Sequence, residues 1–75
     1  SAASDVYKRQ IIKDIYARIK QISGEGMTVV LVEQDTKRAI KTGEISHVML
    51  KGKVVLSGRS AELGEEEIKK AYFGL

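Results

Sequence analysis

The stretch Met27-Thr28-Val29-Val30-Leu31-Val32-Glu33-Gln34-Asp35 is an unbroken apolar run that stops on three polar side chains. Its β-branched and large aliphatic residues predict a strand that is buried on both faces, as the strands of parallel sheets are. Ligands of open α/β sheets bind beyond the carboxyl ends of such strands. The polar residues Glu33, Gln34 and Asp35 are therefore the first candidates for a functional site.

The residues before this stretch predict an amphipathic helix from about Lys8 to Ser23. Apolar side chains recur there every three or four residues, which places them on one face of a helix. Gly24 is expected to be its left-handed C-terminal cap. The apolar stripe consists of Ile11, Ile12, Ile15, Tyr16, Ile19 and Ile22.

The residues after the stretch predict a short helix and then a hairpin. Asp35 is a good N-cap for a helix over residues 36–42, which Gly43 would close. Two β-prone runs, residues 45–50 and 53–57, flank the turn pair Lys51-Gly52, as the strands of a hairpin do.

The end of the chain predicts two further helical segments. A brief turn is expected over residues 60–63. A last helix begins with the acidic residues 65–67 and ends with Lys69 and Lys70, so its charges oppose the helix dipole. Its expected apolar side consists of Ile68, Tyr72 and Leu75.

These elements predict an α/β fold that 75 residues hold only in part. A parallel strand needs neighbours on both sides, and no second strand of that kind follows or precedes residues 28–32. A chain of this length also buries little core. The expected order is helix, buried parallel strand, short helix, β-hairpin and C-terminal helices, as the C-terminal part of a larger sheet.

The composition excludes several classes of function. The chain has no cysteine and a single histidine, so no disulfide framework and no metal site are expected. Its formal net charge of +3 is scattered, and its four aromatic residues form no stacking platform, which argues against nucleic-acid binding. No apolar run approaches the ~20 residues that span a bilayer.

Three motif blocks in order resemble the C-terminal portion of an ATP-binding subunit of ABC transporters. They are Gly24-Glu25-Gly26-Met27-Thr28 leading into Leu31-Val32-Glu33-Gln34-Asp35, then Lys51-Gly52-Lys53-Val54-Val55-Leu56-Ser57-Gly58, and Ser60-Ala61-Glu62-Leu63 running to Ala71-Tyr72-Phe73-Gly74. The Glu-Gln pair and the Ala-Tyr-x-Gly ending are typical of the group that imports branched-chain amino acids. A related lipopolysaccharide-export ATPase has a similar tail and usually carries a histidine after its strand.

The resemblance implies a P-loop NTPase-like sheet and assigns a role to Gln34. In the family, the residue after this strand is the switch residue, which contacts the γ-phosphate of ATP and the attacking water. A glutamine amide donates and accepts hydrogen bonds, but it does not change charge near neutral pH as histidine does. Gln34 is thus the expected catalytic and cofactor-binding position, with ATP and Mg²⁺ as cofactors of the parent subunit.

The other ATP-binding motifs of the family are absent from these 75 residues. There is no G-x-x-x-x-G-K-[ST] loop to hold phosphates, no acidic strand end for Mg²⁺ and no serine-glycine signature. The isolated chain is therefore expected to bind no cofactor and to be inactive as an ATPase. The resemblance also implies permease subunits and a second ATPase subunit as partners, on the cytoplasmic face of the membrane.

Residues 1–10 do not fit the family pattern, which covers residues 11–75. They are interpreted as a leader, a linker or a read-through segment. A different interpretation of the whole chain is a small non-enzymatic interaction module, which associates with itself or with a partner through an uncovered strand edge.

Two other groups of residues are candidates for a catalytic site. Glu33 and Asp35 could form a paired-carboxylate acid/base site, but Asp35 is better explained as an N-cap. His47 lies in a hairpin strand, and no Ser-His-Asp arrangement is expected around it. A structural or surface role is favoured for this histidine.

Overall fold

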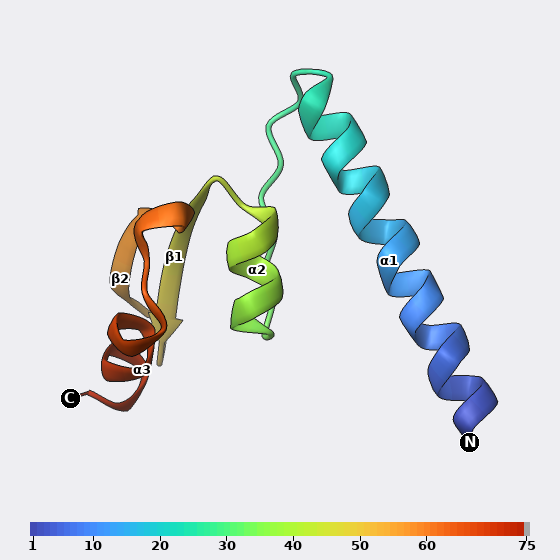
Figure 1. Ribbon diagram of the computed structural model, residues 1–75. Helices are drawn as coiled ribbons and strands as arrows, with labels where there is room; N and C mark the ends of the chain where they lie inside the picture. The colour runs from blue at the N-terminus through green and yellow to red at the C-terminus, as the bar shows by residue number, and fades with distance from the viewer. Residues whose placement is uncertain (75) are drawn as a thin grey trace. The chain divides into compact units, whose positions relative to one another are not determined.

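The computed structural model describes residues 1–74 of the chain. It divides into two compact units, Ser1–Val30 and Leu31–Leu75. The described residues form three α-helices, one 3₁₀-helix and a two-stranded antiparallel sheet (Figure 1). The mixed helix and strand content agrees with the expected α/β class. Leu75, which was expected on the apolar side of the last helix, lies outside the described residues.

The first unit is dominated by helix α1, Ala2–Gly24, which begins earlier than the expected start at Lys8. The Ser1 hydroxyl caps it by accepting a hydrogen bond from the Ser4 amide at 3.2 Å. The helix therefore crosses from residue 10 to residue 11 without interruption.

The C-terminal end of α1 corrects the expected role of Gly24, which is the last helical residue rather than a left-handed cap. Gly26 has the positive φ of 95°. The amide of Gly26 donates to the carbonyl of Ser23 at 3.1 Å, and that of Met27 donates to Ile22 at 3.2 Å. This pair of hydrogen bonds is a Schellman motif, in which the glycine after the cap residue takes the left-handed conformation.

The prediction of a buried parallel strand over residues 28–32 is wrong. Residues 27–33 belong to no strand or helix. Val30 and Val32 are 89% and 95% exposed. The physical reason is the lack of a partner: strands are held by hydrogen bonds to a neighbour, and the two strands among the described residues pair with each other. An apolar pattern alone therefore does not form a strand here.

The hairpin of the second unit agrees with the sequence. Strand β1, Ile45–Leu50, pairs antiparallel with β2, Lys53–Arg59, which continues past the expected end at Ser57. Lys51 and Gly52 both have positive φ, 51° and 77°, as a two-residue type I′ turn requires. The register shifts between Val48 and Met49, which leaves a β-bulge in β2.

The helices of the second unit pack on this hairpin. Helix α3, Glu65–Phe73, contacts both strands, while α2, Thr36–Thr42, contacts β1 and the 3₁₀-helix η1, Ser60–Glu62. These helices agree with the segments predicted after the polar trio, although α3 extends beyond its basic residues.

The core of this unit is small. Val48 of β1 and Ile68 of α3 are the buried hydrophobic residues among those described, at 8% and 7% exposure. The Ser46 and Ser60 hydroxyl oxygens lie 2.6 Å apart and join β1 to η1, where Ser60 is buried. A hydrogen bond from the Ser60 amide to the Glu44 carbonyl, 2.9 Å long, strengthens the same junction.

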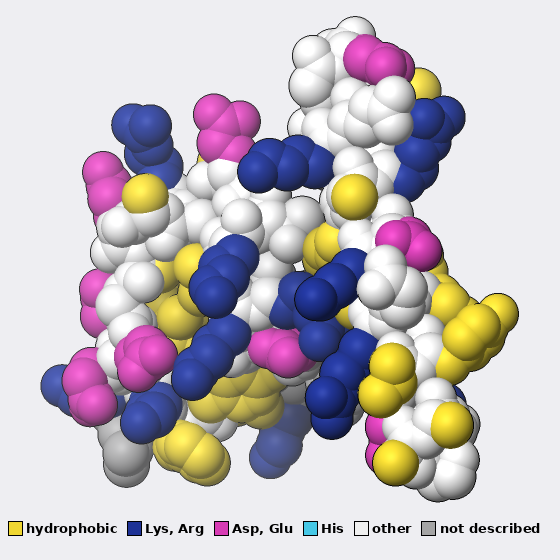
Figure 2. All heavy atoms as spheres, turned by 45° about the vertical axis from the view of Figure 1, so that its right-hand side comes forward, with side chains coloured by type: hydrophobic (Ala, Val, Ile, Leu, Met, Phe, Trp, Pro, Cys, Tyr) yellow, Lys and Arg dark blue, Asp and Glu magenta, His cyan; other side chains and the backbone are white. Residues whose placement is uncertain are grey.

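Many apolar side chains remain at the surface. Figure 2 shows hydrophobic side chains standing among charged ones on the face in view. On α1, Val6 and Tyr7 are 63% and 70% exposed, and Ile15 is half exposed. Within residues 1–74, no helix has both the length and the apolar character needed to cross a membrane.

The buried position of Ile68 generates a prediction about stability. Replacing Ile68 with Ala should lower the free energy of unfolding of the second unit by about 2 kcal/mol, because the change leaves a cavity between α3 and the hairpin. Urea denaturation followed by circular dichroism measures this loss. Val32→Ala is the matched control and should change stability little, since Val32 is 95% exposed. Equal effects of the two substitutions would contradict the described core.

Candidate functional site

The expected switch residue Gln34 lies at a bend between the extended segment and α2. Its side chain is exposed, and none of the hydrogen bonds among the described residues involves it. The amide is therefore available to an external group. Gln34 directly precedes Asp35, the N-cap of α2.

The two carboxylates beside Gln34 are held by one arginine of α2. Arg38 Nη1 lies 3.6 Å from Glu33 Oε2, and Arg38 Nη2 lies 3.8 Å from Asp35 Oδ2. Glu33 also accepts a hydrogen bond from the Asp35 amide through Oε1 at 3.0 Å. The Glu33 side chain is 18% exposed and Arg38 is 38% exposed, so this cluster is only partly in solvent.

The N-cap prediction for α2 is confirmed. Asp35 Oδ1 accepts a hydrogen bond from the Arg38 amide at 3.1 Å, and Asp35 has extended backbone angles, as an N-cap has. Gly43 follows the last helical residue, with its amide bonded to the Ala39 carbonyl at 2.9 Å.

The alternative of a Glu33 and Asp35 acid/base pair gains no support from this geometry. Both carboxylates form ion pairs with Arg38, and Asp35 also caps α2. The cluster is better suited to holding the loop than to moving protons.

His47 has a neighbour that its sequence context did not reveal. Its Nδ1 lies 2.8 Å from the Ser57 hydroxyl on the opposite strand. A regular pairing from the Lys51-Gly52 turn would put Leu56 there; the bulge shifts the register by one residue. Both side chains are exposed on the outer face of the hairpin. A surface position of this kind agrees with the favoured structural role, because a catalytic Ser-His pair needs a buried acid to orient it.

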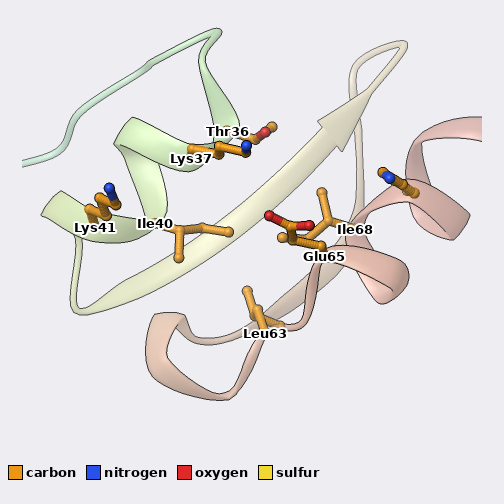
Figure 3. A pocket seen from close by; sticks show the side chains of 8 residues that line it. Thr36, Lys37, Ile40, Lys41, Leu63, Glu65 and Ile68 are labelled. Atoms are coloured by element: carbon orange, nitrogen blue, oxygen red, sulfur yellow. The ribbon is translucent and has the colours of Figure 1, made fainter.

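An open hollow of about 500 Å³ lies between α2 and α3, and Leu63, which precedes α3, also lines it. Figure 3 shows Ile40, Leu63 and Ile68 turned toward this space, while Lys37 and Lys41 come from α2. Its lining therefore combines apolar side chains with the Thr36 hydroxyl, the Glu65 carboxylate and the ammonium groups of lysines. Among the described residues, no group of three or more His, Asp or Glu side chains could hold a metal ion.

Comparison with curated proteins confirms the resemblance to the ATP-binding subunits of ABC transporters for branched-chain amino acids. The chain is similar to the high-affinity branched-chain amino acid transport ATP-binding protein BraG of Pseudomonas aeruginosa. The two are 35% identical over 65 residues, which cover 85% of this chain and 28% of BraG. The chain therefore spans little more than a quarter of this curated relative.

The other comparisons add no relative. No protein-family model and no solved structure matches the chain.

The cap contact of Asp35 generates a prediction about the loop. Asp35→Ala should destabilise the second unit by about 1 kcal/mol, because an amide of the first turn of α2 loses its acceptor. Asp35→Asn should cost much less, since asparagine is an equally good N-cap. Thermal unfolding of the three proteins measures the difference. If Asn and Ala were equally destabilising, the charge and not the cap would carry the effect.

Proposed function

We propose that this chain is the C-terminal portion of the ATP-hydrolysing subunit of an ABC importer for branched-chain amino acids, with a P-loop NTPase-like fold. The observation that carries the proposal is the 35% identity to BraG over 65 residues. BraG is a branched-chain amino acid transport ATP-binding protein, which favours an amino-acid importer over the related lipopolysaccharide-export ATPase. The Glu-Gln pair after the extended segment points the same way.

Gln34 is the switch residue in this proposal. It is exposed at a bend, and its amide can donate to a γ-phosphate oxygen and accept from the attacking water at once. Phosphoryl transfer needs little covalent help from the protein and depends on positioning and on electrostatic stabilisation. Gln34 would therefore orient the water and sense the γ-phosphate without acting as a proton acceptor.

The parent subunit would use ATP and Mg²⁺, which supply the phosphoryl group and neutralise its charge. It would work with a second ATPase subunit and with transmembrane permease subunits, at the cytoplasmic face of the cell membrane. Residues 11–75 would be the family portion of the chain, and residues 1–10 a leader outside it. The chain alone, which holds one nucleotide-contacting position, would not hydrolyse ATP.

A chimera tests the role of Gln34. In BraG, the 65-residue segment that matches this chain would be replaced by the residues of this chain, and ATP hydrolysis would be measured. Gln34→Ala should lower kcat about tenfold or more, because a donor to the transition-state charge is lost. The KM for ATP should stay within a few-fold, and Gln34→His should retain activity.

The control for this experiment is Gln21→Ala, which makes the same chemical change on α1 and should leave turnover unaltered. The unmodified 75-residue chain serves as the inactive blank. Equal turnover of the Gln34→Ala and parent chimeras would reduce Gln34 to a structural residue.

A non-enzymatic interaction module is the second candidate function, and the exposed segment before Gln34 favours it. Val30 and Val32 are almost fully exposed, and residues 27–33 belong to no helix or strand. An extended apolar segment of this kind can pair with a strand of another chain. Self-association of the chain would follow from such pairing.

Substitution at Val30 tests this second candidate. Val30→Lys should shift the chain from an associated species toward monomer, because strand pairing would bring like charges together. Its far-UV circular dichroism should remain that of the parent, since Val30 is 89% exposed and supports no core. Light scattering after size-exclusion chromatography measures the mass. A parent chain that is monomeric at high concentration would rule out self-association.

A further inference from the structure

We propose that Arg38 is a positioning residue that holds the Gln34 backbone in place for the γ-phosphate, an inference that rests on the proposed function of Gln34. Arg38 contacts the residues on both sides of Gln34. The guanidinium lies 3.6 Å from Glu33 and 3.8 Å from Asp35. The sequence neighbours of the switch residue are thus tied to one side chain of α2.

The arrangement restricts the loop at three points. The Asp35 carboxylate accepts from the Arg38 amide, the Glu33 carboxylate accepts from the Asp35 amide, and the Arg38 guanidinium spans both carboxylates. Arginine suits this task because its planar guanidinium holds two nitrogens at a fixed separation, one toward each carboxylate, whereas lysine offers a single point charge. Gln34 lies between the two anchored residues, and its exposed amide is left for a ligand.

Positioning of this kind affects turnover more than global stability. Partly exposed ion pairs add little to global stability, so the contacts of the Arg38 guanidinium are not needed to fold the unit. Its effect is local: it removes conformations of residues 33–35 in which the Gln34 amide would point elsewhere. Small misplacements of a catalytic group lower rates strongly, so a loop held before ATP arrives favours turnover.

The Arg38 side chain can be tested apart from the helix cap. The cap uses the backbone amide of Arg38, which Arg38→Ala retains, while the guanidinium contacts are lost. Lys37→Ala is the matched control, because it removes a cation from the same turn of α2 without touching the cluster. Arg38→Lys keeps the charge and removes the fork.

The first measurement is ¹⁵N relaxation of the full 75-residue chain. The Gln34 amide should have an order parameter near the rigid value of about 0.85 in the parent and in Lys37→Ala, and below about 0.6 in Arg38→Ala. Arg38→Lys should fall between them. Amides of α2 report that the helix is intact. A Gln34 amide that is already mobile in the parent, or equally rigid in Arg38→Ala, would overturn the proposal.

The second measurement is turnover of the BraG chimera. Arg38→Ala should lower kcat about three- to tenfold with the KM for ATP within a few-fold. If Arg38 acts through Gln34, the double variant Gln34→Ala, Arg38→Ala should be no slower than Gln34→Ala alone. Multiplying effects in the double variant would contradict positioning.

These outcomes separate the two proposals. An unaffected Gln34→Ala chimera would refute the switch role itself. A slow Gln34→Ala chimera together with an unaffected Arg38→Ala chimera would refute only the role of Arg38.

Discussion

The pairing of β1 with β2 is the interaction on which the second unit depends. These strands form the sheet of the described residues. Helix α3 contacts both strands, α2 contacts β1, and η1 contacts α2. Val48 of β1 and Ile68 of α3, which contacts both strands, are the buried apolar residues among those described. Without the hairpin, neither helix would have an apolar surface to cover.

The candidate site is connected to this hairpin through α2. Helix α2 contacts β1 and η1, and its first turn binds the Asp35 carboxylate. Arg38 on the same turn reaches back to Glu33. The residues that flank Gln34 are therefore linked to the sheet by one short helix.

The segment before the site shows how far a local pattern can mislead. An apolar run such as residues 27–32 lowers its free energy as a strand only when neighbours supply hydrogen bonds and apolar surface. No described strand does so here, and Val32 remains 95% exposed. The pattern indicates that the run is suited to lie between neighbouring strands, and residues 1–74 supply no such neighbours.

The features that depend on near neighbours could be predicted from the sequence: the Asp35 cap, the Lys51-Gly52 turn and the bounds of α2. Caps, turns and periodicity act over a few residues. Three other features could be seen only in the folded chain. They are the bulge that pairs His47 with Ser57, the contacts of Arg38 with both carboxylates, and the exposure of the apolar run. Those features depend on which segments meet in space, and the free energy of such contacts is set by partners that lie outside any short window of sequence.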